Sequence, residues 1–150
     1  MREAQGLKQR AIAEAVSAYG IDVSKSKSVL YGADNTDGES ETDDEGRVSI
    51  GDDAFKTPGW LASTIAHESE VHVNLQLRGG RNYEGNQGRS MNEVEAYDYE
   101  IRQAKRFGLT DEQVAGLRRS RSHYLDFLSP DNLKRRGRGD YSLEQGHEED

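Results

Sequence analysis

One stretch, Thr57 to Gly80, constrains the fold of this chain more than any other. Thr57 can cap a helix, Pro58 suits the first helical position, and the glycines at 79 and 80 end the helix. Five of its side chains recur at spacings of three and four residues and therefore share one face: Leu61, Ile65, Glu68, His72 and Leu75. Because a buried carboxylate without a partner is costly, Glu68 needs a hydrogen-bond donor or a cation beside it.

The segment from His67 to His72 carries the candidate chemistry. It reads His-Glu-Ser-Glu-Val-His, one residue longer than the His-Glu-x-x-His motif of zinc peptidases. In a regular α-helix, residues four apart lie about 40° apart around the axis, whereas residues five apart lie about 140° apart. A π-bulge, which often marks a functional site, would allow both histidines to hold one metal ion. A buried, metal-free hydrogen-bonded pair of Glu68 and His72 is the structural alternative.

The composition narrows the class of protein. The chain has 150 residues, enough for one domain with a real core, although 32% are charged and only 33% hydrophobic. The net charge of −8 at pH 7 counts against a general nucleic-acid binder, whose affinity comes from neutralising phosphates. Without cysteine, a zinc site must use histidine and carboxylate ligands. No apolar run approaches the ~20 residues of a membrane span, and no signal-peptide core begins the sequence.

The apolar patterns predict a mainly helical α+β protein. Helices are expected at residues 3–19, from Ser90 to Gly108, and from Thr110 to about Phe127. Each of the last two opens with a capping box, a serine or threonine followed three residues later by glutamate or glutamine. Residues 1–130 are assigned to the domain, and residues 131–150 are expected to form a disordered, charged tail.

Two short segments, Ser28–Tyr31 and Arg47–Ile50, have the composition of strands. The simplest arrangement is an antiparallel hairpin joined by the acidic residues 34–45. The oxygen-bearing side chains of this loop do not fall at the positions that an EF-hand requires, so a solvated run of charge is favoured over a calcium site.

A zinc site built on two histidines needs a third protein ligand. The helix that begins at Ser90 offers several carboxylates: Glu93, Glu95, Asp98 and Glu100. Glu93 is expected to have a structural role in the capping box. Glu95 lies off the apolar stripe, so the helical phase alone does not distinguish a ligand from a solvent-facing charge. His123, on the last predicted helix, could replace His72 if the bulge does not form.

The residues from Gly88 to Tyr97 read Gly-Arg-Ser-Met-Asn-Glu-Val-Glu-Ala-Tyr. They resemble the third-ligand helix of anthrax lethal factor and its relatives, in which the second glutamate of Asn-Glu-x-Glu binds zinc. With the motif at His67, residues 47–106 also resemble the zincin metallopeptidase toxins at the C-termini of bacterial polymorphic toxins of the Rhs type. The extra residue in the motif occurs in the dipeptidyl peptidase III family.

The resemblance implies a zincin-like fold, mainly helical with a small antiparallel sheet, and Zn²⁺ as the cofactor. It implies three metal ligands: His67, His72 and Glu95. It also implies that Glu68 is the catalytic carboxylate, which takes a proton from the attacking water. Tyr83 or Tyr97 is expected to donate a hydrogen bond to the oxyanion, and Asp98 to orient a ligand histidine.

The favoured function is that of a zinc-dependent metallopeptidase, a bacterial toxin or effector that cleaves a protein target. Such a toxin would be delivered into a target cell as part of a larger exported protein, and a cognate immunity protein would cover its cleft. No nucleic-acid partner and no membrane partner are expected. The alternatives from other classes are a metal-free binding module with a buried Glu-His pair and a metal-dependent nuclease toxin.

Overall fold

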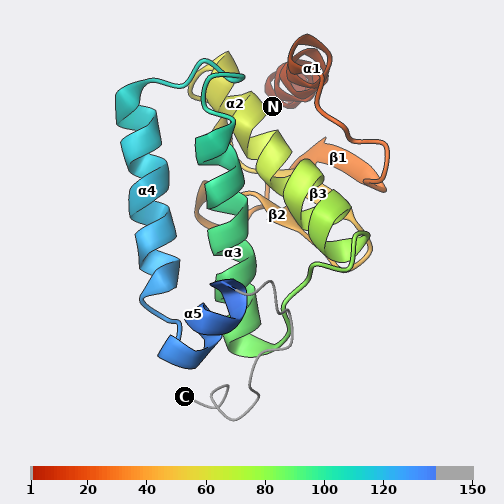
Figure 1. Ribbon diagram of the computed structural model, residues 1–150. Helices are drawn as coiled ribbons and strands as arrows, with labels where there is room; N and C mark the ends of the chain where they lie inside the picture. The colour runs from red at the N-terminus through yellow and green to blue at the C-terminus, as the bar shows by residue number, and fades with distance from the viewer. Residues whose placement is uncertain (1, 138–150) are drawn as a thin grey trace.

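The computed structural model describes residues 2–137, which form five α-helices, a π-helical segment, two short 3-10 turns and three strands (Figure 1). The elements in chain order are α1 (Arg2–Tyr19), β1 (Ser28–Tyr31), η1 (Thr36–Gly38), β2 (Glu41–Thr42), β3 (Arg47–Ile50), η2 (Asp52–Ala54), α2 (Pro58–Ala66), η3 (His67–Leu77), α3 (Gly85–Arg102), α4 (Asp111–Leu125) and α5 (Pro130–Gly137). The predicted α+β class and its helical majority are confirmed.

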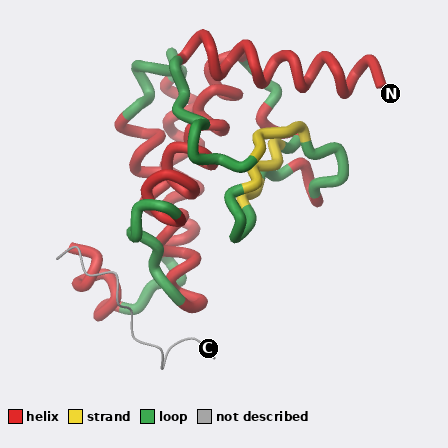
Figure 2. Tube along the Cα trace, turned by 90° about the vertical axis from the view of Figure 1, so that its right-hand side faces the viewer, coloured by secondary structure: helices red, strands yellow, loops and turns green. Residues whose placement is uncertain are grey.

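The motif helix lies between the sheet and the pair of helices α3 and α4. Its first part, α2, packs on α1, and its second part, η3, contacts both β2 and α3. Figure 2 shows the strands together on one side of the helices, with α1 running across the top. Side chains from the sheet on one side and from α3 on the other therefore both reach η3.

The sheet is mixed, in the order β1-β3-β2. β1 runs parallel to β3, with Val29 opposite Val48, and β2 runs antiparallel to β3, with Thr42 opposite Val48. The predicted hairpin between the first and last of these strands is therefore wrong. The acidic segment itself contributes the antiparallel strand, and Gly46, at φ 84°, completes the tight turn into β3. A parallel pair needs a long connection, which the rest of that segment provides.

The main core is formed by α1, α2 and the sheet. Its fully buried members include Ile12, Val48, Ile50, Ile65 and Phe107. A smaller cluster joins the start of α3 to the end of α4: Tyr83, Met91, Val94 and Leu128. Among the described helices, none is both long and apolar enough to cross a membrane.

The helix ends confirm two of the three predicted caps. The Thr57 hydroxyl accepts a bond from the Trp60 amide, and Thr110 forms a full capping box with Gln113. The predicted capping box at Ser90 is wrong, because α3 begins five residues earlier, at Gly85, and Ser90 is buried within the helix. Glu93 therefore has no capping role.

The chain beyond α4 does not become a tail at residue 131. α5 continues to Gly137, and the side chain of Asn132 is fully buried, where its amide donates to Oε1 of Gln87 at 2.7 Å. The domain therefore extends beyond its predicted boundary. The rest of the predicted tail, residues 138–150, lies outside the described residues.

Candidate metal centre

The motif helix changes from α to π geometry at His67. α2 ends at Ala66, and the next eleven residues, His67–Leu77, are π-helical. In a π-helix each amide bonds the carbonyl five residues back, as Arg78 does to Val73 at 2.8 Å, so the turn is wider and residues five apart return to one side. The π geometry that two histidines at this spacing need is therefore present, as a long segment instead of a single bulge.

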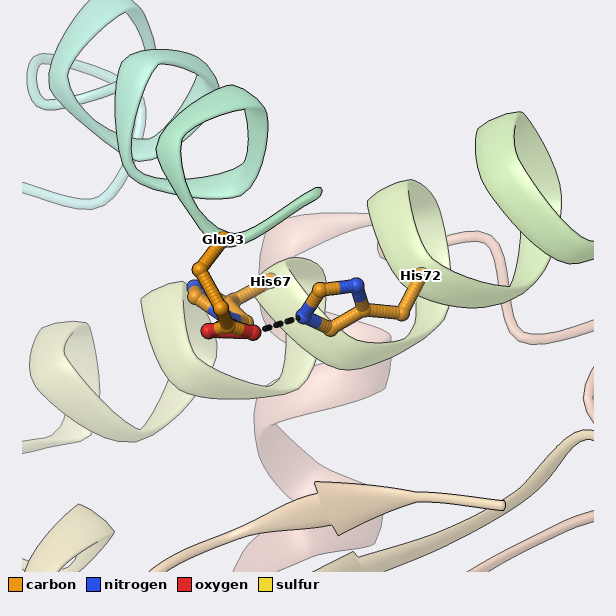
Figure 3. Close-up of side chains that lie close together, drawn as sticks. All are labelled: His67, His72 and Glu93. Carbon is orange, nitrogen blue, oxygen red and sulfur yellow. Dashed lines mark hydrogen bonds and ion pairs between the residues drawn. The ribbon is translucent and has the colours of Figure 1, made fainter. Parts of the chain in front are cut away.

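The wider turn brings His67 and His72 together. Their ring centroids lie 4.8 Å apart. The carboxylate of Glu93 points from α3 toward both rings, with Oε1 2.6 Å from Nε2 of His72 and Oε2 3.4 Å from Nε2 of His67 (Figure 3). One possible ligand atom from each residue lies within 4.8 Å of the other two. Two imidazoles and a carboxylate are a donor set that zinc accepts, leaving a fourth position for water.

Glu95 does not join the two histidines, which corrects the sequence prediction. It lines a small pocket with Val71 and Leu75 of η3 and with Arg102, a pocket that neither histidine lines. Residues two apart on an α-helix are separated by about 200°, so Glu93 and Glu95 point to different sides of α3, and only Glu93 reaches the two histidines. The sequence does contain a signal for Glu93: Glu93, Tyr97 and Glu100 recur at spacings of four and three and share one helical face.

Glu100 supports His67 from behind. Its side chain is buried, and Nδ1–H of His67 donates to Oε1 of Glu100 at 2.5 Å, while the Ser63 hydroxyl donates to Oε2. This bond leaves Nε2 of His67 directed at Glu93. Asp98 does not have the orienting role predicted for it, because it pairs with Arg121 of α4. A carboxylate behind a histidine fixes its tautomer and raises its basicity as a ligand.

His72 is oriented in the same way by a neutral partner. Nδ1–H of His72 donates to Oε1 of Gln76 at 2.7 Å. The amide group of Gln76, which is buried, then donates to the backbone carbonyl of Asn92 on α3 at 2.9 Å. Both imidazoles are therefore held with Nε2 toward Glu93.

His67, His72 and Glu93 shift one another's pKa values. Burial lowers the pKa of His67, but the carboxylates of Glu93 and Glu100 outweigh it and raise that pKa well above the usual value. Burial also lowers the pKa of His72, but Glu93 outweighs burial and raises that pKa above its usual value. Burial raises the pKa of Glu93, but the two histidines lower it far below its usual range. A divalent cation would take the place of these protons, so metal affinity should rise with pH.

Glu68 lies beside the cluster without belonging to it. Its side chain is buried, Oε1 accepts a hydrogen bond from the Thr42 hydroxyl at 2.7 Å, and Oε2 lies 3.8 Å from Nε2 of His67. The hydrogen-bonded pair of Glu68 and His72 is not formed among the described residues, because His72 bonds Gln76 and Glu93 instead.

Comparisons with protein-family models, curated proteins and solved structures found no match to this chain.

The tyrosines differ in how close they come to the centre. Tyr83 is buried against Met91 and lines the wall of a hollow beside the centre. The Tyr97 ring packs 4.8 Å from that of His67, and burial raises the pKa of Tyr97. Tyr124, which the sequence analysis did not select, stacks on Tyr97 with centroids 6.0 Å apart and borders the centre from α4.

His123 lies away from the two histidines. Its ring packs on Tyr124 and Phe127 at centroid distances of 5.3 Å each. The residue that the structure brings to His67 is thus His72, as the extended motif predicts, and His123 does not substitute for it.

Proposed function

We propose that this chain is a zinc-dependent hydrolase of peptide bonds whose metal ligands are His67, His72 and Glu93. One observation carries the proposal: π geometry gathers two histidines five residues apart against a carboxylate from a second helix. Both imidazoles are held by a hydrogen bond on the far nitrogen. Three protein ligands with supporting partners and an open fourth position are typical of catalytic zinc.

In this proposal Glu68 is the general base. A bound zinc ion would supply a water of lowered pKa and polarise the scissile carbonyl. Thr42 occupies one carboxylate oxygen of Glu68, which leaves the other, Oε2, beside the cluster to take a proton and pass it to the leaving amine. Tyr97 and Tyr124 border the same space and are the candidates to donate a hydrogen bond to the oxyanion.

We also propose that the substrate is a protein inside a cell into which the chain is delivered as a bacterial toxin, and that an immunity protein covers the cleft. The support for delivery is the resemblance of residues 47–106 to zincin toxins of the Rhs type. We also propose, on the same resemblance, that the fold as a whole is zincin-like.

The substitution Glu68→Gln tests the mechanism. Glutamine keeps the size of the side chain and can still accept the bond from Thr42, but it cannot take up a proton. We expect a folded, zinc-loaded protein whose peptide cleavage falls by ~10²–10⁴-fold and whose expression no longer arrests a sensitive cell. Glu95→Gln, outside the cluster, is the matched control and should cleave as wild type does. A zinc-loaded Glu68→Gln protein with wild-type cleavage would contradict the mechanism.

Two other functions predict different results. A metal-dependent nuclease would cleave nucleic acid instead of peptide and would also lose activity in Glu68→Gln. A metal-free binding module would hold no zinc, and its effect on a cell would survive this nearly isosteric change.

A further inference from the structure

Two hollows border the candidate centre, one at His67 and the other at His72, and they share a wall. One, of about 200 Å³, extends between α2 and α4 past Trp60 and Leu117. The other, of about 420 Å³, extends past His72 toward Asn82 and Arg89. The residues common to both are Glu39, Ser40, Glu68, Glu93 and Tyr124. Because both hollows are open to solvent and meet at Glu68 and Glu93, they form one groove that passes through the centre.

The segment from Glu39 to Asp44 forms one wall of the larger hollow. It includes β2, which lies at the edge of the sheet and pairs with no described strand other than β3. Thr42, in the middle of this wall, is joined to Glu68 by its hydroxyl. The wall therefore has a fixed place beside the residue proposed as the general base, and any chain in the groove must run along it.

Three of the four exposed acidic side chains of this wall have no basic partner among the residues that the structure describes. Within the described part of the chain, Glu39, Glu41 and Asp44 make no ion pair with lysine or arginine. Their neighbours in the turn, by contrast, are paired: Asp43 with Arg47 at 2.6 Å and Glu45 with Lys27 at 3.0 Å. Glu39 lines both hollows, so its negative charge lies at the groove.

We propose that the groove binds an internal, extended segment of a polypeptide that carries a lysine or arginine next to the scissile bond, on the side of β2. The proposal rests on the peptidase function and specifies its substrate class. A groove open at both ends accepts a chain that continues in both directions, whereas an enzyme that trims chain ends needs a closed end. Arg89 also lines the larger hollow, so the attraction for a cation is confined to the acidic wall at residues 39–44, where negative charge concentrates ligands of positive charge and speeds their binding.

Peptide binding to the Glu68→Gln protein, with zinc added, tests this without requiring cleavage. The probes are labelled peptides of about eight residues, long enough to cross both hollows, blocked at both ends and differing only in a central lysine or glutamine. Fluorescence anisotropy should show at least about tenfold tighter binding of the lysine peptide at low salt. The difference should shrink as salt is raised, because these carboxylates are exposed.

Glu39→Gln and Glu45→Gln, each placed on the Glu68→Gln background, are the test variant and its control. Both positions are exposed glutamates, but only the first lines the groove. The preference for lysine should fall severalfold in Glu39→Gln and stay unchanged in Glu45→Gln.

Equal affinity for the two peptides, or binding only when a chain end is unblocked, would overturn the proposal. Failure of the peptidase function has a different signature. In that case the wild type would cleave neither peptide, while the preference for lysine and its dependence on Glu39 would persist, leaving a groove that binds cationic chains without cutting them.

Discussion

At the scale of single residues, the geometry of the centre depends on the side chain that accepts a hydrogen bond from Nδ1–H of each histidine. The buried carboxylate of Glu100 holds His67, and the buried amide of Gln76 holds His72. The two supports differ in charge, so the two ligands should differ in basicity, with His67 the stronger donor. Asp98 lies only two residues from Glu100 on α3, but it pairs with Arg121 and not with a histidine.

Replacing Glu100 by glutamine should therefore weaken zinc binding without abolishing it. The amide keeps the shape and an acceptor oxygen for Nδ1–H of His67 but removes the charge that strengthens the ligand. We expect zinc affinity, measured by competition with a chelator of known affinity, to fall by about 10–100-fold. The matched control Asp98→Asn should bind zinc as tightly as wild type. Equal loss in both variants would mean that Glu100 acts only through general stability.

At the scale of elements, the sequence predicts the presence of a helix better than it predicts where the helix begins and which of its residues face the centre. The extra residue between the histidines indicates that a shared metal ion requires a departure from α geometry, because residues five apart do not face one metal in an α-helix. The start of α3 was missed: Ser90 resembles a cap but lies inside a helix that begins at Gly85. That error gave Glu93 a capping role, and the resemblance then indicated Glu95 as the ligand. The parallel pairing of β1 with β3 depends on tertiary contacts that no local pattern encodes.

The hydrogen bond from Thr42 of β2 to Glu68 of η3 can be tested by substitution. Thr42→Val keeps the shape of the side chain but removes the hydroxyl that holds Glu68. We expect peptide cleavage to fall by about tenfold, since a general base must be held within hydrogen-bond reach of the proton it takes. Zinc content should not change. Ser24→Ala is the control, because the Ser24 hydroxyl bonds Asp22, outside both hollows. Unchanged cleavage in Thr42→Val would show that Glu68 is positioned by other contacts.

At the scale of the whole molecule, one ion pair joins three distant parts of the chain. Glu70 of η3 accepts two hydrogen bonds from Arg106, at 2.7 and 2.9 Å, and a third from the Tyr99 hydroxyl at 2.6 Å. Arg106 also donates to the backbone carbonyls of Tyr19 and Gly20, at the end of α1. The network thus ties the π-helix to α1 on the side away from the metal cluster.

This network should make the protein sensitive to acid. Burial raises the pKa of Glu70, but Arg106 and its other donors outweigh this and hold the pKa below the ordinary 4.5. The stability that Glu70 contributes is therefore present above pH 4.5 and is lost as the pH falls through the lowered value. In zinc-free protein, Glu70→Gln should lower the free energy of unfolding near neutral pH by about 1–3 kcal/mol and flatten its decline in acid. Chemical denaturation across this pH range measures both, and an unchanged slope would contradict the assignment.

The central claim is that Glu93, and not Glu95, completes a zinc site with His67 and His72. Elemental analysis of metal-replete Glu93→Gln and Glu95→Gln, beside wild type, tests it most directly, because the two substitutions are chemically identical and two residues apart. The proposed site predicts about one zinc per chain in wild type and in Glu95→Gln, and a large loss in Glu93→Gln, since an amide is a poorer zinc ligand than a carboxylate. Full zinc in Glu93→Gln, with loss in Glu95→Gln, would contradict it.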